Sequence, residues 1–365
     1  MKEKRGENMK KILKIFFLIS IFSLVGCGVK NADNVLEKLE KKLKKADSYY
    51  LEGTMEIINH EDTYTYDVKV SHQKQDYYRI ELTNTLNNHK QVILRNDDGV
   101  YVVTPSLNKS FKFQSDWPYN NSQVYLLNSI LEDLTEDENK EFKNNGEGYL
   151  FTSEVNYPNN KALIKQKVYI NKDASITKVE VVDKEDNIQI IMRFLKQEYN
   201  KKFNKNHFEL SELLDINKNK YESATDNIKN NKEPGTNNDA KSEEKIETKP
   251  TATIDDIIYP MYLPSNTYLT SQEIIDTENG QRLILTFSGD SSFILVEEVA
   301  KNNSDGLIIP VSGEFDFLSD VIGIIGTNSL SWHSNGIDYY IASDSITTAE
   351  LVEIAKSICV LPVSK

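Results

Sequence analysis

Residues 64–71 read YTYDVKVS, with a large apolar or aromatic side chain at every second position. Successive side chains of a β-strand point to opposite faces of the sheet, so this pattern predicts a strand with one buried and one solvent-facing side. The same period of two recurs on both sides of this stretch, at 51–57 and 78–83. Neighbouring strands of this kind predict an antiparallel sheet with a core on one face.

Further strands and two helices surround this centre. The predicted strands after it are 92–94, 100–103, 149–153, 163–170, 176–182 and 188–195. Apolar side chains at helical spacing predict amphipathic helices at 35–46 and 122–134. The order predicts an α+β fold in which a large curved antiparallel sheet has its concave side covered by helices.

The first hairpin turn is predicted at Asp97-Asp98-Gly99, between two apolar runs. Two adjacent aspartates are also potential calcium ligands. The wider pattern of a calcium-binding loop does not accompany them, so the turn is the favoured interpretation.

Three short stretches in this half carry a resemblance: NSQVYLL at 121–127, VNYPNN at 155–160, and Gln166-Lys167. With them, residues 32–212 resemble lipoproteins of spore-forming Firmicutes related to the LolA superfamily. That group includes the GerS germination lipoproteins and the YdcC-type sporulation lipoproteins. The resemblance implies a LolA-like antiparallel half-barrel with a helical lid over a hydrophobic concave face, at residues 32–216.

The N-terminal stretch is typical of a signal peptide at residues 1–26. Six basic side chains precede the apolar run 15–25, which is too short to span a bilayer as a stable helix, and a compact basic region also follows Met9. The run ends in Leu24-Val25-Gly26-Cys27, which resembles a bacterial lipobox. Leu24, Val25 and Gly26 are the predicted signal-peptidase recognition residues, and Cys27 is the predicted lipidation site, with 27–31 as a tether. We therefore expect a diacyl anchor at the outer face of the cell membrane or a spore membrane.

Charge and cysteine content narrow the class of protein. The net charge is −13, and removal of 1–26 leaves −17. Such an acidic body excludes nucleic acid as the expected partner, because phosphates require clustered Lys and Arg. The cysteines are Cys27 and Cys359, so lipidation of the first leaves no intrachain disulfide.

A linker is predicted at 217–253. Between Asn217 and Pro250 seven basic side chains balance seven acidic ones, and only five residues are apolar. Such a segment buries too little apolar surface to offset the entropy of ordering it. A short, weakly packed helix around 221–230 is the alternative interpretation.

Limited proteolysis is expected to cut the chain between Asn217 and Pro250 and to leave two stable fragments. Gel electrophoresis and mass spectrometry of a digestion time course will locate the cuts. Protection of the whole segment would show instead that it packs on a domain.

Residues 254–365 are predicted to form a small α+β sheet domain. Its expected strands are 282–287, 292–298, 329–334 and 337–342, and Thr347 with Glu350 forms a capping box for a last helix. The stretches FILVEE at 293–298, GIDYY at 336–340 and AKSI at 355–358, with Trp332, resemble the DUF4367-type domain.

The residues give no sign of catalysis. None of the five histidines (His60, His72, His89, His207, His333) stands at a metal-ligand spacing from another ligand. Nucleophile-elbow, Walker and dinucleotide motifs are missing, and Gly323-Ile324-Ile325-Gly326 has no basic neighbour to help bind phosphate. Carboxylate pairs such as Asp255-Asp256 would serve a glycosidase only if two groups faced each other across a cleft. We expect no enzyme activity, no catalytic or metal-binding residues and no cofactor.

Two functions follow as expectations. By the resemblance, the protein is a membrane-anchored binding or accessory protein of sporulation or germination, with a spore-cortex or cell-wall hydrolase as its protein partner. The alternative is a lipid or lipoprotein carrier, or an envelope-stress sensor, with a hydrophobic ligand in the half-barrel. Tyrosines crowd the first domain; most are expected to pack across strands, and a minority to lie at a protein interface.

Overall fold

The computed structural model describes residues 26–59, 62–215, 253–254, 257–278 and 280–358. The chain divides into two compact units. The first unit comprises residues 1–58 and 117–201, and the second comprises 59–116 and 202–365. Leu24 and Val25, Cys359 and most of the predicted linker lie outside the described residues. The predicted domain boundaries stay predictions.

The first unit contains an antiparallel sheet with the strand order β1-β11-β10-β9-β8-β7. Its strands are β1 (Ser48–Asn59), β7 (Glu141–Asn144), β8 (Gly148–Glu154), β9 (Lys165–Asn171), β10 (Ile176–Val182) and β11 (Ile188–Tyr199). All but β7 were predicted. The short β7 has charged and exposed side chains, so it shows no apolar period.

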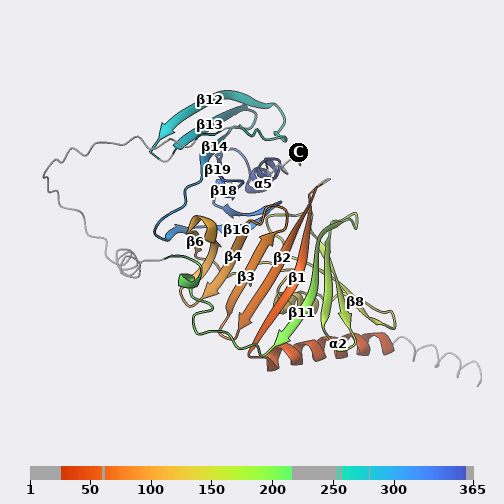
Figure 1. The fold of residues 1–365 in the computed structure, drawn as a ribbon. Helices are drawn as coiled ribbons and strands as arrows, with labels where there is room; N and C mark the ends of the chain where they lie inside the picture. The colour runs from red at the N-terminus through yellow and green to blue at the C-terminus, as the bar shows by residue number, and fades with distance from the viewer. Residues whose placement is uncertain (1–25, 60–61, 216–252, 255–256, 279, 359–365) are drawn as a thin grey trace, which may run out of the picture. The chain divides into compact units, whose positions relative to one another are not determined.

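Two helices pack on this sheet, α2 (Gly26–Lys45) and α3 (Leu127–Glu136). Figure 1 shows α2 along the ends of the first unit's strands, and the Lys38 Nζ donates to the carbonyl of Lys172 in the β9–β10 turn at 2.8 Å. The second predicted helix was expected from residue 122 but begins at 127. Its expected first turn is not helical: Ser122 exchanges hydrogen bonds with Asn156, and residues 124–125 form a separate turn.

The interior between these helices and their sheet is filled by side chains. Leu39, Leu127 and Leu134 from the helices are fully buried, as are Met55, Phe151 and Val168 from the strands. Tyr49 and Tyr125 are buried as well, which agrees with tyrosines that pack inside rather than at an interface. A filled interior disfavours an acyl chain as the occupant of this unit.

The second unit contains two sheets. In one, β2 to β6 follow one another antiparallel, and β15 pairs parallel with β6 at the edge. Its strands are β2 (Asp62–Gln73), β3 (Tyr77–Asn84), β4 (Lys90–Asn96), β5 (Gly99–Thr104), β6 (Lys109–Phe113) and β15 (Leu307–Val311), with η1 at Pro105–Leu107. The predicted hairpin at 97–99 is confirmed, since Asn96 pairs with Gly99. One face is covered by Phe208, Leu210 and Leu214, around η2 (Leu210–Glu212).

The other sheet has seven strands in the order β12-β13-β14-β19-β18-β17-β16, all antiparallel. Its strands are β12 (Thr267–Thr277), β13 (Gly280–Gly289), β14 (Phe293–Val299), β16 (Glu314–Leu318), β17 (Val321–Ile325), β18 (Ser329–Ser334) and β19 (Ile337–Ala342). Helix α5 (Thr348–Lys356) packs on β18 and β19, and its predicted cap is present, with Glu350 N–H donating to Thr347 Oγ1. The core face includes Leu285, Leu295 and Trp332.

Within the second unit the two sheets face each other where β16 and β17 pack on the β2–β6 strands. Phe113 and Phe315 meet edge to face at 5.2 Å between ring centroids. Gln91 accepts the N–H of Ile322 through Oε1 at 2.7 Å, and Tyr66 donates to the carbonyl of Ser319 at 2.8 Å. The buried Gln91 is thus satisfied by the backbone of β17, which fixes the register of the two sheets.

The predicted fold class is confirmed. The chain is mostly β with few helices, and the large curved sheet is followed along the chain by a smaller antiparallel sheet with one helix. The strands β6, β12, β15, β16 and β17 were not predicted either. Gly323, from the Gly323-Ile324-Ile325-Gly326 run considered for phosphate binding, lies in the middle of β17.

Candidate functional site

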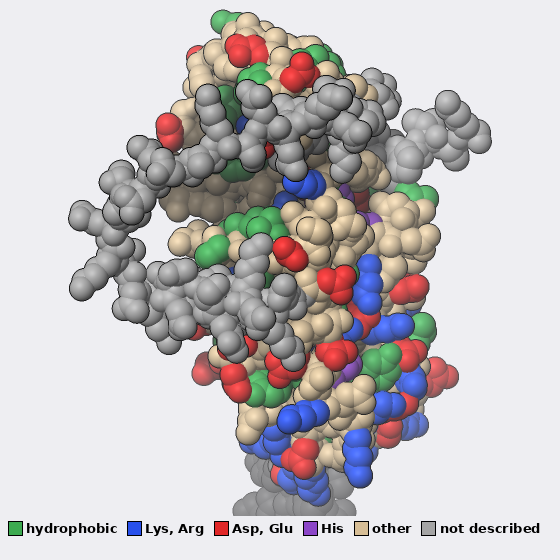
Figure 2. All heavy atoms as spheres, turned by 60° about the vertical axis from the view of Figure 1, so that its left-hand side comes forward, with side chains coloured by type: hydrophobic (Ala, Val, Ile, Leu, Met, Phe, Trp, Pro, Cys, Tyr) green, Lys and Arg blue, Asp and Glu red, His purple; other side chains and the backbone are tan. Residues whose placement is uncertain are grey.

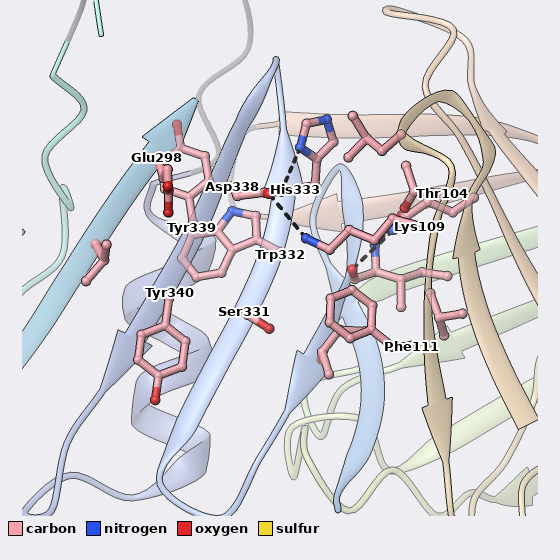
Figure 3. Close-up of a pocket in the computed structure, with 16 residues that line it drawn as sticks. Thr104, Lys109, Phe111, Glu298, Ser331, Trp332, His333, Asp338, Tyr339 and Tyr340 are labelled. Atoms are coloured by element: carbon pink, nitrogen blue, oxygen red, sulfur yellow. Dashed lines mark hydrogen bonds and ion pairs between the residues drawn. The ribbon is translucent and has the colours of Figure 1, made fainter. Parts of the chain in front are cut away.

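A groove lies in the second unit where its two sheets diverge, and we call it the β6–β19 groove (Figure 3). It encloses about 280 Å³. Its lining residues come from the β4–β6 region and from β14, β17, β18 and β19: Gln91, Val102, Thr104, Leu107, Lys109, Phe111, Val296, Glu298, Ile322, Ile324, Ser331, Trp332, His333, Asp338, Tyr339 and Tyr340.

Strand alternation places the polar side chains of this groove. Tyr339 and Ile341 of β19 belong to the core under α5. Asp338 and Tyr340, one position away in each case, therefore point to the opposite face of the sheet. On β18, His333 is the direct cross-strand partner of Asp338, so the two side chains stand side by side.

Three charged or titratable groups form a chain at one end of the groove, as Figure 3 shows. Lys109 Nζ lies 3.2 Å from Asp338 Oδ2, and His333 Nδ1 lies 3.1 Å from Asp338 Oδ1. Burial alone would raise the pKa of Asp338, but the hydrogen bond from His333 and the charge of Lys109 together hold it below the ordinary value. Asp338 thus stays ionised near neutral pH and orients the other two groups.

A second histidine, His89, lies next to His333. The ring centroids of His89 and His333 are 5.4 Å apart. Burial, and secondly the charge of His333, lower the pKa of His89 to about 4, so its imidazole is neutral at pH 7. His72 is also buried, with its pKa lowered to about 4 by burial, and it stacks on Tyr78 at 4.4 Å. These contacts give His72 a structural role.

The walls of the groove are apolar. Val102, Ile322 and Val296 line it, and Phe111 and Tyr340 stand at its sides. Tyr340 is 43% exposed. The open face of β13, β14, β18 and β19 continues past Tyr340 into a second, wider hollow of about 630 Å³ rich in serine hydroxyls. Figure 2 shows a hollow on the side it brings forward, with hydrophobic side chains along one rim.

Lys109 and Asp338 were not anticipated from the sequence. They are 229 positions apart, and the GIDYY stretch that contains Asp338 gave no sign of a partner for its carboxylate. The one local sign was the alternation in 329–342, where Ser331 and His333 are the polar positions around Trp332. That alternation identifies an exposed face but not what lies opposite.

The predicted lipobox is only partly within the described chain. Gly26 and Cys27 fall at the start of α2, but their side chains, like Leu24 and Val25 altogether, lie outside the described part. The lipidation site therefore stays a prediction. Among the described residues no helix is long and apolar enough to cross a membrane.

The residues that carry the family resemblance build a buried polar network in the first unit. Asp133 accepts hydrogen bonds from Ser122 Oγ and from Gln166 Nε2, each at 3.0 Å, and Gln123 N–H donates to Ser129 Oγ at 2.8 Å. Burial raises the pKa of Asp133 to about 7, although both hydrogen bonds act against this shift. The contacts of Asp133 tie α3 to the segment before it and to β9, so the motif has a structural role.

No group of three or more His, Cys, Asp or Glu side chains in the described chain is arranged to hold a metal ion. The histidines that the structure describes lie in ring stacks or hydrogen bonds to single partners. His60 lies outside the described residues.

Glu297 is a buried carboxylate next to the groove strands, on the core face of β14. It is 0% exposed and has no hydrogen bond of ordinary length among described residues, only a weak approach from the backbone N–H of Ile258. Burial raises its pKa to about 7. The folded state thus binds this proton more tightly than the unfolded state, so stability is lost as the pH rises from the ordinary pKa toward 7.

Natural Glu297 is expected to lose stability as the pH rises, whereas glutamine does not titrate. The free energy of unfolding of Glu297→Gln, relative to that of the natural chain, is therefore expected to increase by about 2–3 kcal/mol from pH 5 to pH 8. Urea unfolding at a series of pH values measures this difference. Glu298→Gln is the matched control, since Glu298 points to the other face and pairs with Arg282 at 2.9 Å. If the free energies of unfolding of Glu297→Gln and the natural chain changed with pH in parallel, the raised pKa assigned to Glu297 would be contradicted.

Residues 9–208 match the family described as "Sporulation protein YdcC-like". The sporulation protein YdcC of Bacillus subtilis (strain 168) is 35% identical over 355 residues, which cover 96% of this chain and 98% of that protein.

Solved structures are similar only at a distance. A MucA/MucB complex of Pseudomonas aeruginosa is 11% identical, with a TM-score of 0.31, over 88% of this chain and 97% of that chain. The LolA superfamily protein NE2245 from Nitrosomonas europaea is 11% identical, with a TM-score of 0.30, over 50% and 99%. A chain from the complex of the CwlD amidase with the GerS lipoprotein of Clostridioides difficile is 16% identical, with a TM-score of 0.22, over 46% and 95%.

These structural scores are too low to carry an argument, but the sequence match does not depend on them. It extends over nearly the whole of both chains and includes both units. The chain belongs to the YdcC-like family of sporulation proteins.

Proposed function

We propose that this protein is a lipid-anchored, extracytoplasmic binding protein of sporulation or germination that holds a protein partner in the β6–β19 groove without chemistry of its own. The family membership supports a role in sporulation. The lipobox-like stretch ending at Cys27 supports the anchor and the extracytoplasmic location.

The observation that carries the binding role is the construction of the groove. About 280 Å³ is room for one or two side chains rather than for a large ligand. Apolar walls, aromatic sides and an ion-paired polar end are the features of a pocket that receives an anchoring side chain at a protein interface. Phe111 and Lys109 from one sheet face Tyr340 and Asp338 from the other.

The polar end of the groove is better suited to recognition than to acid–base chemistry. A catalytic base works best with a pKa near the operating pH. Asp338 has its pKa lowered and is shared between Lys109 and His333, so it is a weak base. The same ion pair offers a partner both a cation and a hydrogen-bond acceptor.

The class of partner is proposed from the sequence. The resemblance of residues 32–212 to a group of lipoproteins that includes the germination lipoproteins favours a spore-cortex or cell-wall hydrolase. An anchor at Cys27 would hold the groove near the membrane and raise the effective concentration of such a neighbour. The alternative of a lipid carrier is disfavoured by the filled interior of the first unit, where Leu39, Leu127 and Phe151 are fully buried.

The test is site-specific photo-crosslinking in sporulating cells. Benzoylphenylalanine replaces Tyr340 in the groove or, as a matched control, Tyr119 in the first unit, which is 50% exposed. The proposal expects one strong covalent adduct from position 340 and none of that size from 119, with the adduct identified by mass spectrometry as a cell-wall hydrolase. Equal adducts from both positions, or none from 340, would overturn the groove as the binding site.

A further inference from the structure

The edge strands of the sheets differ in length, in charge and in the apolar side chains that they expose. An edge strand presents unpaired backbone N–H and C=O groups and can pair with another chain, so natural proteins shorten or charge their edges. Among the strands that the structure describes, the first unit's sheet ends at β7, and the two sheets of the second unit end at β15, β12 and β16.

Three of these edges are blunted. The strand β7 has four residues, two of them charged, Glu141 and Lys143. The strand β15 has five residues and contains Pro310, which lacks a backbone donor. The strand β16 also has five residues and contains Glu314 and Asp316.

The fourth edge, β12, is longer, and its two charged residues, Glu273 and Asp276, leave most of its length uncharged. It runs for eleven residues without proline, lysine or arginine. Four of its apolar side chains are exposed: Tyr268 61%, Leu269 38%, Ile274 56% and Ile275 43%. Beside it, Tyr259 donates to Gln272 Oε1 at 2.7 Å, and the nearby Met261 is 84% exposed.

The register shows that the apolar side chains lie on both faces of this edge. Leu269 and Ile274 pair with Phe287 and Leu283, which point into the core. Ile275 and Tyr268 pair with Arg282 and Ser288 and therefore point to the other face. A strand added next to β12 would find apolar partners above and below, as a strand inside a sheet does.

The acidic charge of β12 and its surroundings indicates which kind of chain can pair with this edge. Glu273 and Asp276 are exposed on β12, and residues 254–365 hold sixteen acidic side chains against four basic ones. A second copy of this acidic edge would be repelled, whereas a basic segment would be attracted. Register puts Glu273 and Asp276 on opposite faces, so basic residues on either face of the incoming strand would meet a carboxylate.

We propose that β12 binds an extended segment of a partner protein, rich in apolar residues and carrying lysine or arginine, as an added antiparallel or parallel strand. This surface is separate from the β6–β19 groove and goes beyond the function proposed for it. Backbone hydrogen bonds would supply affinity, and the side chains on the two faces would supply selectivity.

The experiment uses the chain without residues 1–27 and a fluorescent ten-residue peptide of isoleucine, threonine and two lysines. Fluorescence anisotropy measures its binding. Two matched peptides serve as controls. In one, glutamate replaces lysine. In the other, N-methyl groups block backbone nitrogens that point to each of the two edges of the strand. The N-methylated peptide keeps every side chain but cannot pair with a strand.

The proposal expects saturable binding of the lysine peptide and at least about tenfold weaker binding of each control peptide, a difference of about 1.4 kcal/mol. Glu273→Lys with Asp276→Lys is expected to weaken the lysine peptide by a similar factor. Glu138→Lys with Glu147→Lys, which changes the charge equally on exposed residues of the first unit, should leave it within about twofold.

Three results would overturn it. Equal binding of the N-methylated peptide would show attraction by charge alone. Unchanged binding by the Glu273→Lys, Asp276→Lys chain would place the peptide elsewhere. A concentration-dependent dimer in sedimentation, lost in that same chain, would make a second copy the occupant of β12. Groove substitutions such as Tyr340→Ser should not affect the peptide, so failure here is distinguishable from failure of the groove proposal.

Discussion

A Cys27→Ala chain is expected either to be released from the membrane fraction or to stay there only as an uncleaved precursor. The thiol is the only group in the lipobox-like stretch that can form the thioether to diacylglycerol. Each buried methylene of an acyl chain contributes about 0.8 kcal/mol to membrane affinity, so two chains hold the protein where none would. Fractionation with immunoblotting, and mass spectrometry of the N-terminus, measure the outcome.

Cys359→Ala is the matched control, because it removes the other cysteine of the chain and should leave the membrane fraction unchanged. A processed Cys27→Ala protein that still requires detergent for extraction would contradict the lipid anchor. Retention of an uncleaved Cys27→Ala precursor would not contradict the lipid anchor, because the uncleaved signal segment itself holds that chain in the membrane.

Gly53→Val is expected to destabilise the first unit by more than about 3 kcal/mol. Gly53 lies in β1 where the register with β11 shifts, and a Cβ at this position would stand 2.2 Å from the carbonyl oxygen of Arg193. Backbone on both sides must move to relieve such an overlap, at the cost of ladder hydrogen bonds. Thermal unfolding of the chain without residues 1–27 measures the loss.

Thr54→Val is the control for this change. It adds the same side chain to the next position of β1, which is half-buried and already has a Cβ, so the expected change is below about 1 kcal/mol. Equal stability of the two valine chains would show that β1 and β11 can separate freely at the bulge, and would contradict the close approach.

Strands with one polar face were predictable from the sequence. The stretch 64–71 alternates because β2 has one side in the core and the other in solvent, as its buried Tyr66, Val68 and Val70 show. The cap of α5 was predictable because it depends only on Thr347 and Glu350, three residues apart.

Strands without that alternation were missed for physical reasons. All five residues of β17 are buried, since one face meets the core under α5 and the other meets the β2–β6 strands. The strand β12 has apolar residues on both faces of a free edge, with Ile274 and Ile275 adjacent, so no period of two appears. In both cases the surroundings of the strand, which the sequence does not display, determine the pattern.

The groove was beyond sequence reasoning because its two walls come from separate strands of the chain. Lys109 follows η1 at the start of β6, and Asp338 lies in β19. Only the folded second unit brings the ammonium and the carboxylate to 3.2 Å. The alternation of β18 and β19 predicted which side chains face outward, but not that another sheet would stand opposite them.

The most direct test of the account is the yield of heat-resistant, colony-forming spores from strains that carry Tyr340→Ser or Tyr119→Ser in place of the natural gene. Both substitutions remove an exposed tyrosine of similar accessibility, 43% and 50%, and immunoblots of the membrane fraction verify equal amounts of anchored protein. If the groove holds the partner, Tyr340→Ser lowers the yield as far as deletion of the gene does, and Tyr119→Ser matches the natural strain. A natural yield from the Tyr340→Ser strain, or from the deletion strain, would contradict the account.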